Sequence, residues 1–183
     1  MAHDTKLIQL TNDKELNKNK EKKEDDLVPI PPNSIINGEG GAYIESIGFF
    51  TSYGERIEVL HHRCKVKIII KIVSKVYVHN PWIGFSIINS QNIRVIGTNN
   101  YGLKVNLQPI NENTTVKYSF EFDFPEIANG KYFISVAIND GIPEAHVRLF
   151  NVLDAYEFEF CSNSLLQKQN ALIKLTDCKI EVL

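Results

Sequence analysis

The sequence is poor in cysteine and has no long apolar run. Its three cysteines, Cys64, Cys161 and Cys178, are an odd number at wide spacing, whereas a secreted disulfide framework uses an even number. We therefore expect reduced thiols in an intracellular protein. No apolar run approaches the roughly 20 residues that a helix needs to cross a bilayer. The opening MAHDTKLIQL has neither the basic region nor the apolar stretch of a secretory signal, so none is predicted.

The motifs of the common enzyme families are absent as well. The sequence contains no GxxxxGKS/T phosphate loop, no GxSxG, no HExxH and no CxxC. The glycine-rich run at residues 38–41 is followed by neither Lys-Ser nor a helical pattern, so it predicts a turn. We interpret His61 and His62, next to Cys64, as exposed turn residues, because adjacent histidines on a strand would point to opposite faces and would not share a metal ion without a distorted loop. We predict no enzymatic activity, no cofactor and no metal site.

An excess of charge of one sign is also missing. Lysine and arginine number 20, aspartate and glutamate 22, and the net charge is −2. This balance gives no electrostatic attraction to a nucleic-acid backbone or to an anionic membrane. We therefore expect no nucleic-acid partner.

A polar segment precedes the apolar part of the 183-residue chain. Residues 11–26 (TNDKELNKNKEKKEDD) mix both charges, and such a segment buries too little apolar area to offset its ordering entropy. The proline-rich residues 28–32 (VPIPP) then stiffen the entry to the fold. We interpret residues 1–33 as a flexible polar tail or as the linker from an upstream domain. Residues 34–183 are predicted to form one folded domain.

From about residue 41 the pattern is that of β-strands. Residues 116–124 (VKYSFEFDF) alternate apolar and polar side chains, as expected of a strand with one buried face. Asn129-Gly130 and Asp140-Gly141 are turn signals that flank a second alternating segment. Further strands are predicted at residues 42–51, 64–74, 82–89, 94–98, 103–107, 147–150, 156–160 and 172–182, with a short helix at 165–170. Short strands joined by such turns predict an all-β, antiparallel sandwich of the immunoglobulin-like or jelly-roll kind.

One succession of segments is more specific than the general β pattern. Residues 79–102 (HNPWIGFSIINSQNIRVIGTNNYG) join an Asn-Pro entry, an Ile-Gly-Phe strand, a polar turn and a strand ending in Gly-Thr-Asn. GEGGAYIESIGFF precedes them, and FEFDF, NGKYFISVAINDG and DAYEFEF follow in order. Over roughly residues 38–160, this order and spacing resemble the C-terminal domain of the ATP-binding subunit of ABC transporters that export O-antigen polysaccharide, the Wzt family. The region after Phe160 departs from the pattern.

The resemblance implies a non-catalytic carbohydrate-binding domain. Such a domain recognises lipid-linked O-antigen polysaccharide in the cytoplasm and selects it for export. The implied partners are the polysaccharide, an upstream ATPase domain and the membrane permease subunit of the transporter. Because the parent subunit works as a pair, we expect a homodimer, held in the cytoplasm at the periphery of the inner membrane through the transporter.

A glycan site needs an aromatic ring for stacking and short polar side chains for the hydroxyl groups. The candidates on or near the faces opposite the core are Trp82, Ser86, Arg94, Thr98, Asn100, Tyr101, Phe133, Ser135, Asn139 and Arg148. Trp82 and Tyr101 are equally interpreted as packed aromatic residues, Phe133 as covered by a strand or a dimer partner, and Arg94 as a solvated charge. His146 and Arg148 reach either the same sheet or a phosphate on a modified sugar.

Two other functions compete with glycan binding. A protein-interaction or dimerisation sandwich without glycan binding would use an exposed strand edge. A glycan-active enzyme would require two facing carboxylates. The carboxylates Glu121, Asp123 and Glu126 are explained by the solvated side of a strand, so the enzyme is the least favoured of the three.

Overall fold

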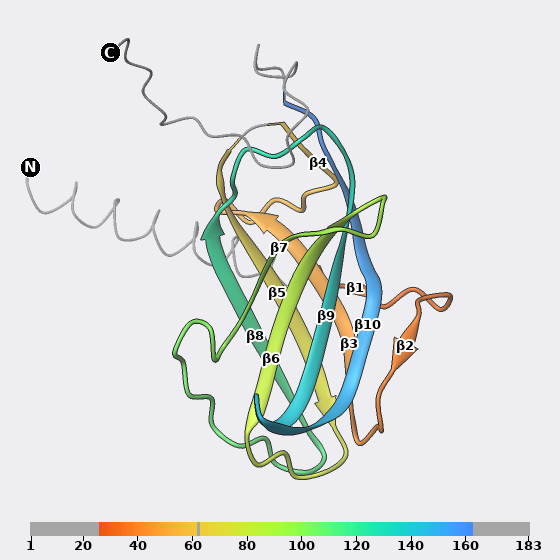
Figure 1. The fold of residues 1–183 in the computed structure, drawn as a ribbon, viewed down its shortest axis with the longest axis vertical. Helices are drawn as coiled ribbons and strands as arrows, with labels where there is room; N and C mark the ends of the chain where they lie inside the picture. Colours follow the sequence, from red (N-terminus) through yellow and green to blue (C-terminus); the bar gives the residue numbers. More distant parts are fainter. Residues whose placement is uncertain (1–25, 62, 163–183) are drawn as a thin grey trace, which may run out of the picture.

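The computed structural model describes residues 26–61 and 63–162, which form a sandwich of two β-sheets (Figure 1). One sheet has the strand order β1-β3-β5-β8, and the other has the order β2-β10-β9-β6-β7 with β4 beside β10. The first sheet consists of β1 (Val28–Pro29), β3 (Ala42–Thr51), β5 (Lys65–Ser74) and β8 (Thr114–Asp123). The second consists of β2 (Ile36–Asn37), β4 (Val59–Leu60), β6 (Pro81–Asn89), β7 (Arg94–Asn99), β9 (Gly130–Ile142) and β10 (Ala145–Phe160).

Neighbouring strands pair antiparallel, except that β4 pairs parallel with β10. The prediction of an all-β antiparallel sandwich is confirmed. Within residues 26–61 and 63–162, no helix has the length and apolar character to cross a bilayer.

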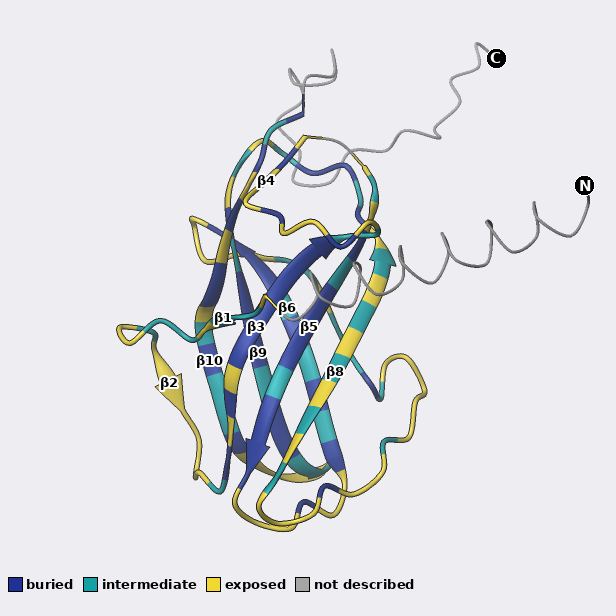
Figure 2. Ribbon diagram, turned by 180° about the vertical axis from the view of Figure 1, so that it is seen from behind, coloured by how far each residue is buried: buried dark blue, intermediate teal, exposed yellow. Residues whose placement is uncertain are grey.

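The core lies between the sheets because each long strand turns its apolar alternate residues inward. Ile68, Ile70 and Ile72 of β5 are fully buried, and Figure 2 shows β8 alternating between partly buried and exposed residues. The ring of Phe85 on β6 packs 5.4 Å from that of Phe122 on β8, which joins the two sheets. Each such buried side chain contributes roughly 1.5–3 kcal/mol to stability.

The predicted strand positions are largely confirmed, with two corrections. The strands predicted at 147–150 and 156–160 are one continuous strand, β10, with a register shift between Val152 and Tyr156. Asp154 in this irregular stretch has a φ of 56°, which sequence alternation does not foresee. The strand predicted at 103–107 is wrong, because these residues form turns and irregular structure. Lys104 there has a φ of 57°, outside the extended region that a strand requires. The predicted helix at 165–170 and the strand at 172–182 lie outside the described residues.

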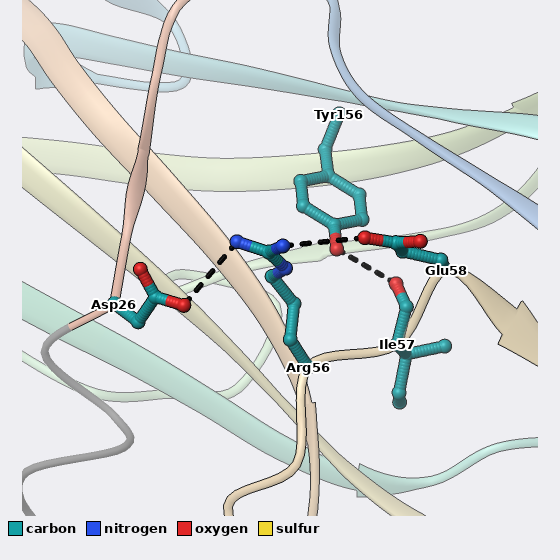
Figure 3. Close-up of polar contacts among 5 residues, drawn as sticks. All are labelled: Asp26, Arg56, Ile57, Glu58 and Tyr156. Carbon is teal, nitrogen blue, oxygen red and sulfur yellow. Dashed lines mark hydrogen bonds and ion pairs between the residues drawn. The ribbon is translucent and has the colours of Figure 1, made fainter.

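The segment that enters the sandwich is attached to it from residue 26 onward (Figure 3). The carboxylate of Asp26 lies 3.3 Å from the guanidinium of Arg56, which also contacts Glu58 at 3.2 Å. Val28 pairs with Ile47 of β3. Residues 26–30 therefore pack on the domain, and the flexible tail stays a prediction for residues 1–25, which lie outside the described residues.

Candidate functional site

A shallow groove of about 230 Å³ lies on the outer face of the larger sheet. Residues from β6, β7, β9 and β10 line it. Its volume is below the 300–1,000 Å³ typical of closed small-molecule pockets. The groove therefore suits a short stretch of an extended ligand better than a ligand that is fully enclosed.

The floor of the groove is low because the outward positions at the centre of the sheet carry small side chains. Gly84 of β6 pairs with Ala137 of β9, and Ser86 of β6 pairs with Ser135 of β9. A Cβ atom on Gly84 would lie 2.7 Å from the carbonyl oxygen of Thr98, so this position accepts no side chain without a shift of β7. The inward neighbours are large, so the same strands fill the core on one side and leave a hollow on the other.

One end of the groove is closed by aromatic rings. Trp82 of β6 packs at steep angles against Tyr101, with ring centroids 5.6 Å apart, and against His146, with centroids 4.5 Å apart. The Tyr101 hydroxyl donates a hydrogen bond of 2.8 Å to the carbonyl of Gly141. These contacts fix the indole beside the hollow, where its apolar face can pack against the C–H groups of a ligand.

Two buried polar atoms in this groove lack a hydrogen-bond partner among the described residues. They are the Ser135 hydroxyl oxygen and the Asn139 side-chain oxygen, and both residues line the groove. The other end of the Asn139 amide donates to the carbonyl of Trp82 at 3.4 Å. Because buried polar groups are nearly always paired, these two atoms mark a place where a hydroxyl-bearing ligand would gain hydrogen bonds.

Basic side chains stand at both sides of the groove. On β7, a register shift in the pairing with β6 places Arg94 opposite Ile88 and Ile96 opposite Ile87. The Cδ atom of Arg94 lies 3.6 Å from the position of a Cβ on Gly97, so the side chain runs along its own strand. On β10, the Arg148 guanidinium donates to the side-chain oxygen of Asn37 on β2 at 3.4 Å.

The structure brings together most of the residues predicted for the site. Those that line the groove are Trp82, Ser86, Arg94, Thr98, Ser135, Asn139 and Arg148. The register shift changes the place of Thr98, which pairs with the inward Phe85. Its side chain therefore turns toward the interior, although sequence alternation placed it on the face of Arg94. Thr98 also borders a separate apolar cavity of about 190 Å³ beneath the 100–107 loop.

Three predicted residues do not line the groove. Asn100 is 5% exposed, and its side chain accepts from the Ile83 N–H at 2.9 Å and donates to the carbonyls of Pro81 and Val105 at 3.2 Å. Tyr101 stands behind Trp82. Phe133 pairs with Ile88 toward the far end of β9. The position of Asn100 indicates a structural role in holding the loop after β7.

Sequence reasoning missed several lining residues. Asn99 of β7 and Asn151 of β10 contribute amides to the lining, and the small Gly84 and Ala137 leave the hollow open. Gly97 does not line the groove, but its missing side chain leaves room for that of Arg94. Asn151 falls between the two strands that were predicted in place of β10, so its face was not assigned. Because Ser86 and Ser135 were predicted on the faces opposite the core, the small Gly84 and Ala137, two residues away on the same faces, were the available signal.

Other chemistry is scarce in the part of the chain that the structure describes. It holds no group of three or more His, Cys, Asp or Glu residues arranged to hold a metal ion. Cys64 and Cys161 are free thiols, and burial raises the pKa of Cys64. Glu121 is half-exposed on the outer face of β8 and lies 3.6 Å from Lys65.

Comparison with known proteins gives one family. The family model described as the Wzt C-terminal domain matches residues 33–170. A crystal structure of the C-terminal domain of Wzt superposes with a TM-score of 0.71 at 16% sequence identity, covering 85% of this chain and 93% of that chain. A Niemann-Pick type C2 protein from Japanese carpenter ant gives a TM-score of 0.44 at 9% identity, covering 69% of this chain and 98% of that chain. No curated protein matches the chain in sequence.

Proposed function

Because the chain belongs to the Wzt C-terminal domain family, and so has a role in the O-antigen transporter, we propose that it is a non-catalytic module that binds O-antigen polysaccharide. In this role it recognises the lipid-linked polymer in the cytoplasm and selects it for export. Its partners are the polymer, an ATPase domain and the permease subunit of the transporter. It lies at the periphery of the inner membrane through these partners and works as a homodimer.

The observation that carries this proposal is the pair of unpartnered polar atoms beside the indole of Trp82. The Ser135 hydroxyl and the Asn139 side-chain oxygen are buried without a hydrogen-bond partner among the described residues, and both residues line the groove, so a sugar hydroxyl group that reached them would supply the missing partner. The indole of Trp82 offers apolar surface to the C–H side of a sugar ring. Each neutral hydrogen bond contributes only about 0.5–1.5 kcal/mol, because water competes for the same groups. A groove of this size and depth is therefore expected to bind with a Kd in about the micromolar to millimolar range. A dimer with two grooves raises the effective affinity for a long polymer by avidity.

Titration calorimetry with O-polysaccharide purified from the bacterium that encodes the chain tests the proposal. Saturable binding is expected, and S135A should weaken it about three- to tenfold, which corresponds to one hydrogen bond. Ser119→Ala is the matched control, because Ser119 is exposed on β8 in the opposite sheet. An absence of heat and of retention on immobilised polymer would refute glycan binding. A stable oligomer with the same negative result would favour the alternative of an interaction or dimerisation domain.

A further inference from the structure

We propose that the groove selects an acidic polysaccharide whose negative charges lie on sugars spaced along the polymer. This inference rests on the proposed glycan-binding function and specifies the class of glycan. It starts from the charges that line the groove. Arg94, Arg148 and His146 are among the lining residues, and none of the residues that line it is Asp or Glu. The whole chain carries 22 acidic and 20 basic residues. The absence of carboxylates from the groove lining is therefore not explained by a lack of acidic residues in the chain.

Several basic residues elsewhere on the sandwich form ion pairs, unlike the arginines of the groove. Lys71 lies 2.6 Å from Glu45, and Lys131 lies 2.7 Å from Glu157. Arg56 contacts both Asp26 and Glu58. Within residues 26–61 and 63–162, neither Arg94 nor Arg148 has a carboxylate partner. No carboxylate of the described residues therefore competes with an acidic group of a ligand for either guanidinium, although that of Arg148 also donates to Asn37.

The two arginines do not form a single clamp. Arg94 is on β7 and Arg148 on β10, with β6 and β9 between them. Three strand spacings separate β7 from β10 by about 14 Å. Arg94 is level with Ile88 of β6, whereas Arg148 is level with Trp82, and these six residues add about 20 Å along the strands. The Arg94 side chain runs along β7 over Gly97, and the Arg148 guanidinium reaches outward to Asn37 on β2. Because the strand order and the register set the two residues far apart, one carboxylate or one phosphate does not bridge them, and each arginine meets a separate anionic group.

This placement indicates how the polymer crosses the sheet. Its chain passes over the small residues Gly84, Ser86 and Ala137 from β7 toward β10, and one sugar lies beside Trp82. The acidic groups of two sugars then face Arg94 on one side and Arg148 with His146 on the other. Guanidinium groups pair with carboxylates and phosphates through two parallel hydrogen bonds. The anionic group is therefore a carboxylate of an acidic sugar or a phosphate in the repeat.

The test compares native O-polysaccharide of the encoding bacterium with the same polymer after removal of its charges. One portion is treated with carbodiimide and borohydride, which reduces carboxyl groups to alcohols, and a second with aqueous hydrofluoric acid, which removes phosphate. We expect binding to the native polymer and a loss of at least about tenfold in affinity after one of the two treatments, which identifies the anion. Added salt should weaken the native interaction, because both arginines are exposed.

Substitutions give a second measurement on the same polymer. Arg94→Gln and Arg148→Gln should each weaken binding about five- to tenfold and reduce its salt dependence. Lys75→Gln, at an exposed position after β5, is the control and should change neither quantity. Equal binding of the native and both treated polymers overturns the acidic-glycan inference while glycan binding itself stands. An effect of only one arginine overturns the two-contact arrangement, and no binding of the native polymer overturns the proposed function together with this inference.

Discussion

Trp82 on β6 and His146 on β10 pack with ring centroids 4.5 Å apart and ring planes at 75°, although β9 runs between their strands. His146 pairs with Gly141 of β9, and Gly141 has no side chain to separate the rings. A Cβ there would lie 2.8 Å from the Cα of His146, and its φ of 125° favours glycine. The indole is thus held by neighbours from two other segments, His146 and Tyr101.

Substitution of Trp82 should separate binding from folding. W82A removes the proposed stacking surface, and we expect a loss of at least about tenfold in glycan affinity, because burying apolar ligand surface against an aromatic side chain contributes on the order of 1.5–3 kcal/mol. Since Trp82 is the single tryptophan of the sequence, its fluorescence reports the groove directly. Native polymer should shift or quench the emission in a saturable manner. Saturable binding by calorimetry without any change in fluorescence would place the ligand elsewhere.

The unpartnered hydroxyl of Ser135 predicts opposite effects on stability and on binding. S135A removes a buried polar atom that has no hydrogen-bond partner among the described residues. The free energy of unfolding should stay the same or rise by about 1 kcal/mol, while glycan affinity falls. Urea unfolding of the free protein, set beside the calorimetric titration, checks both. A drop in stability of several kcal/mol would mean that the hydroxyl is paired in solution.

Asn100 should behave as a structural residue and not as a sugar ligand. N100A removes three side-chain hydrogen bonds and leaves the Ile83 N–H and the Val105 carbonyl without this partner. We expect a loss of about 2–3 kcal/mol in the free energy of unfolding. The glycan affinity of the protein that remains folded should be unchanged. If affinity fell and stability did not, Asn100 would belong to the binding site after all.

Tyr156 predicts sensitivity to alkaline pH. Burial raises the pKa of Tyr156 from 10.0 to about 12, and its hydroxyl donates to the Ile57 carbonyl at 2.7 Å (Figure 3). The folded state therefore holds this proton more tightly than the unfolded state does. The contribution to stability is complete below about pH 10 and is lost as the pH rises toward 12.

Denaturant unfolding at a series of pH values checks this prediction. Stability should fall between about pH 10 and 12, and Y156F should reduce the slope while lowering stability at neutral pH through loss of the hydrogen bond. Tyr118 and Tyr132 also have raised pKa values through burial, so part of the slope should persist in the variant. An unchanged slope in Y156F would contradict the prediction.

The sequence predicted the sandwich well because period-2 alternation is a local property. The segment 42–51, for example, has the predicted bounds of β3. The groove was predicted in part for the same reason, since Trp82 and Ser86 lie opposite the inward Ile83 and Phe85. Alternation in the sequence does not reveal where a register shift or bulge changes the face of the sheet on which a side chain lies. The register shift at β7 turned Thr98 inward, and the irregularity at Asp154 hid the continuity of β10 and with it Asn151.

The loop after β7 shows the second limit. Apolar residues at 103, 105 and 107 suggested a strand, yet they border an apolar cavity beside the edges of the two sheets. Leu103 and Val105 stay exposed, and the path of this loop is set by hydrogen bonds of Asn100 to the distant Pro81 and Ile83. Such tertiary pairing overrides a local β pattern.

The attachment of residues 26–30 also has a mechanical consequence. A pull on the chain upstream of Asp26 first loads the exposed ion pair with Arg56 and then the two-residue strand β1, before any strand of the core carries load. This entry segment should therefore detach under tension while the two sheets stay packed together. Each residue released lengthens the segment that precedes the sandwich by up to about 3.3–3.6 Å, so the length of this segment depends on the tension applied to it.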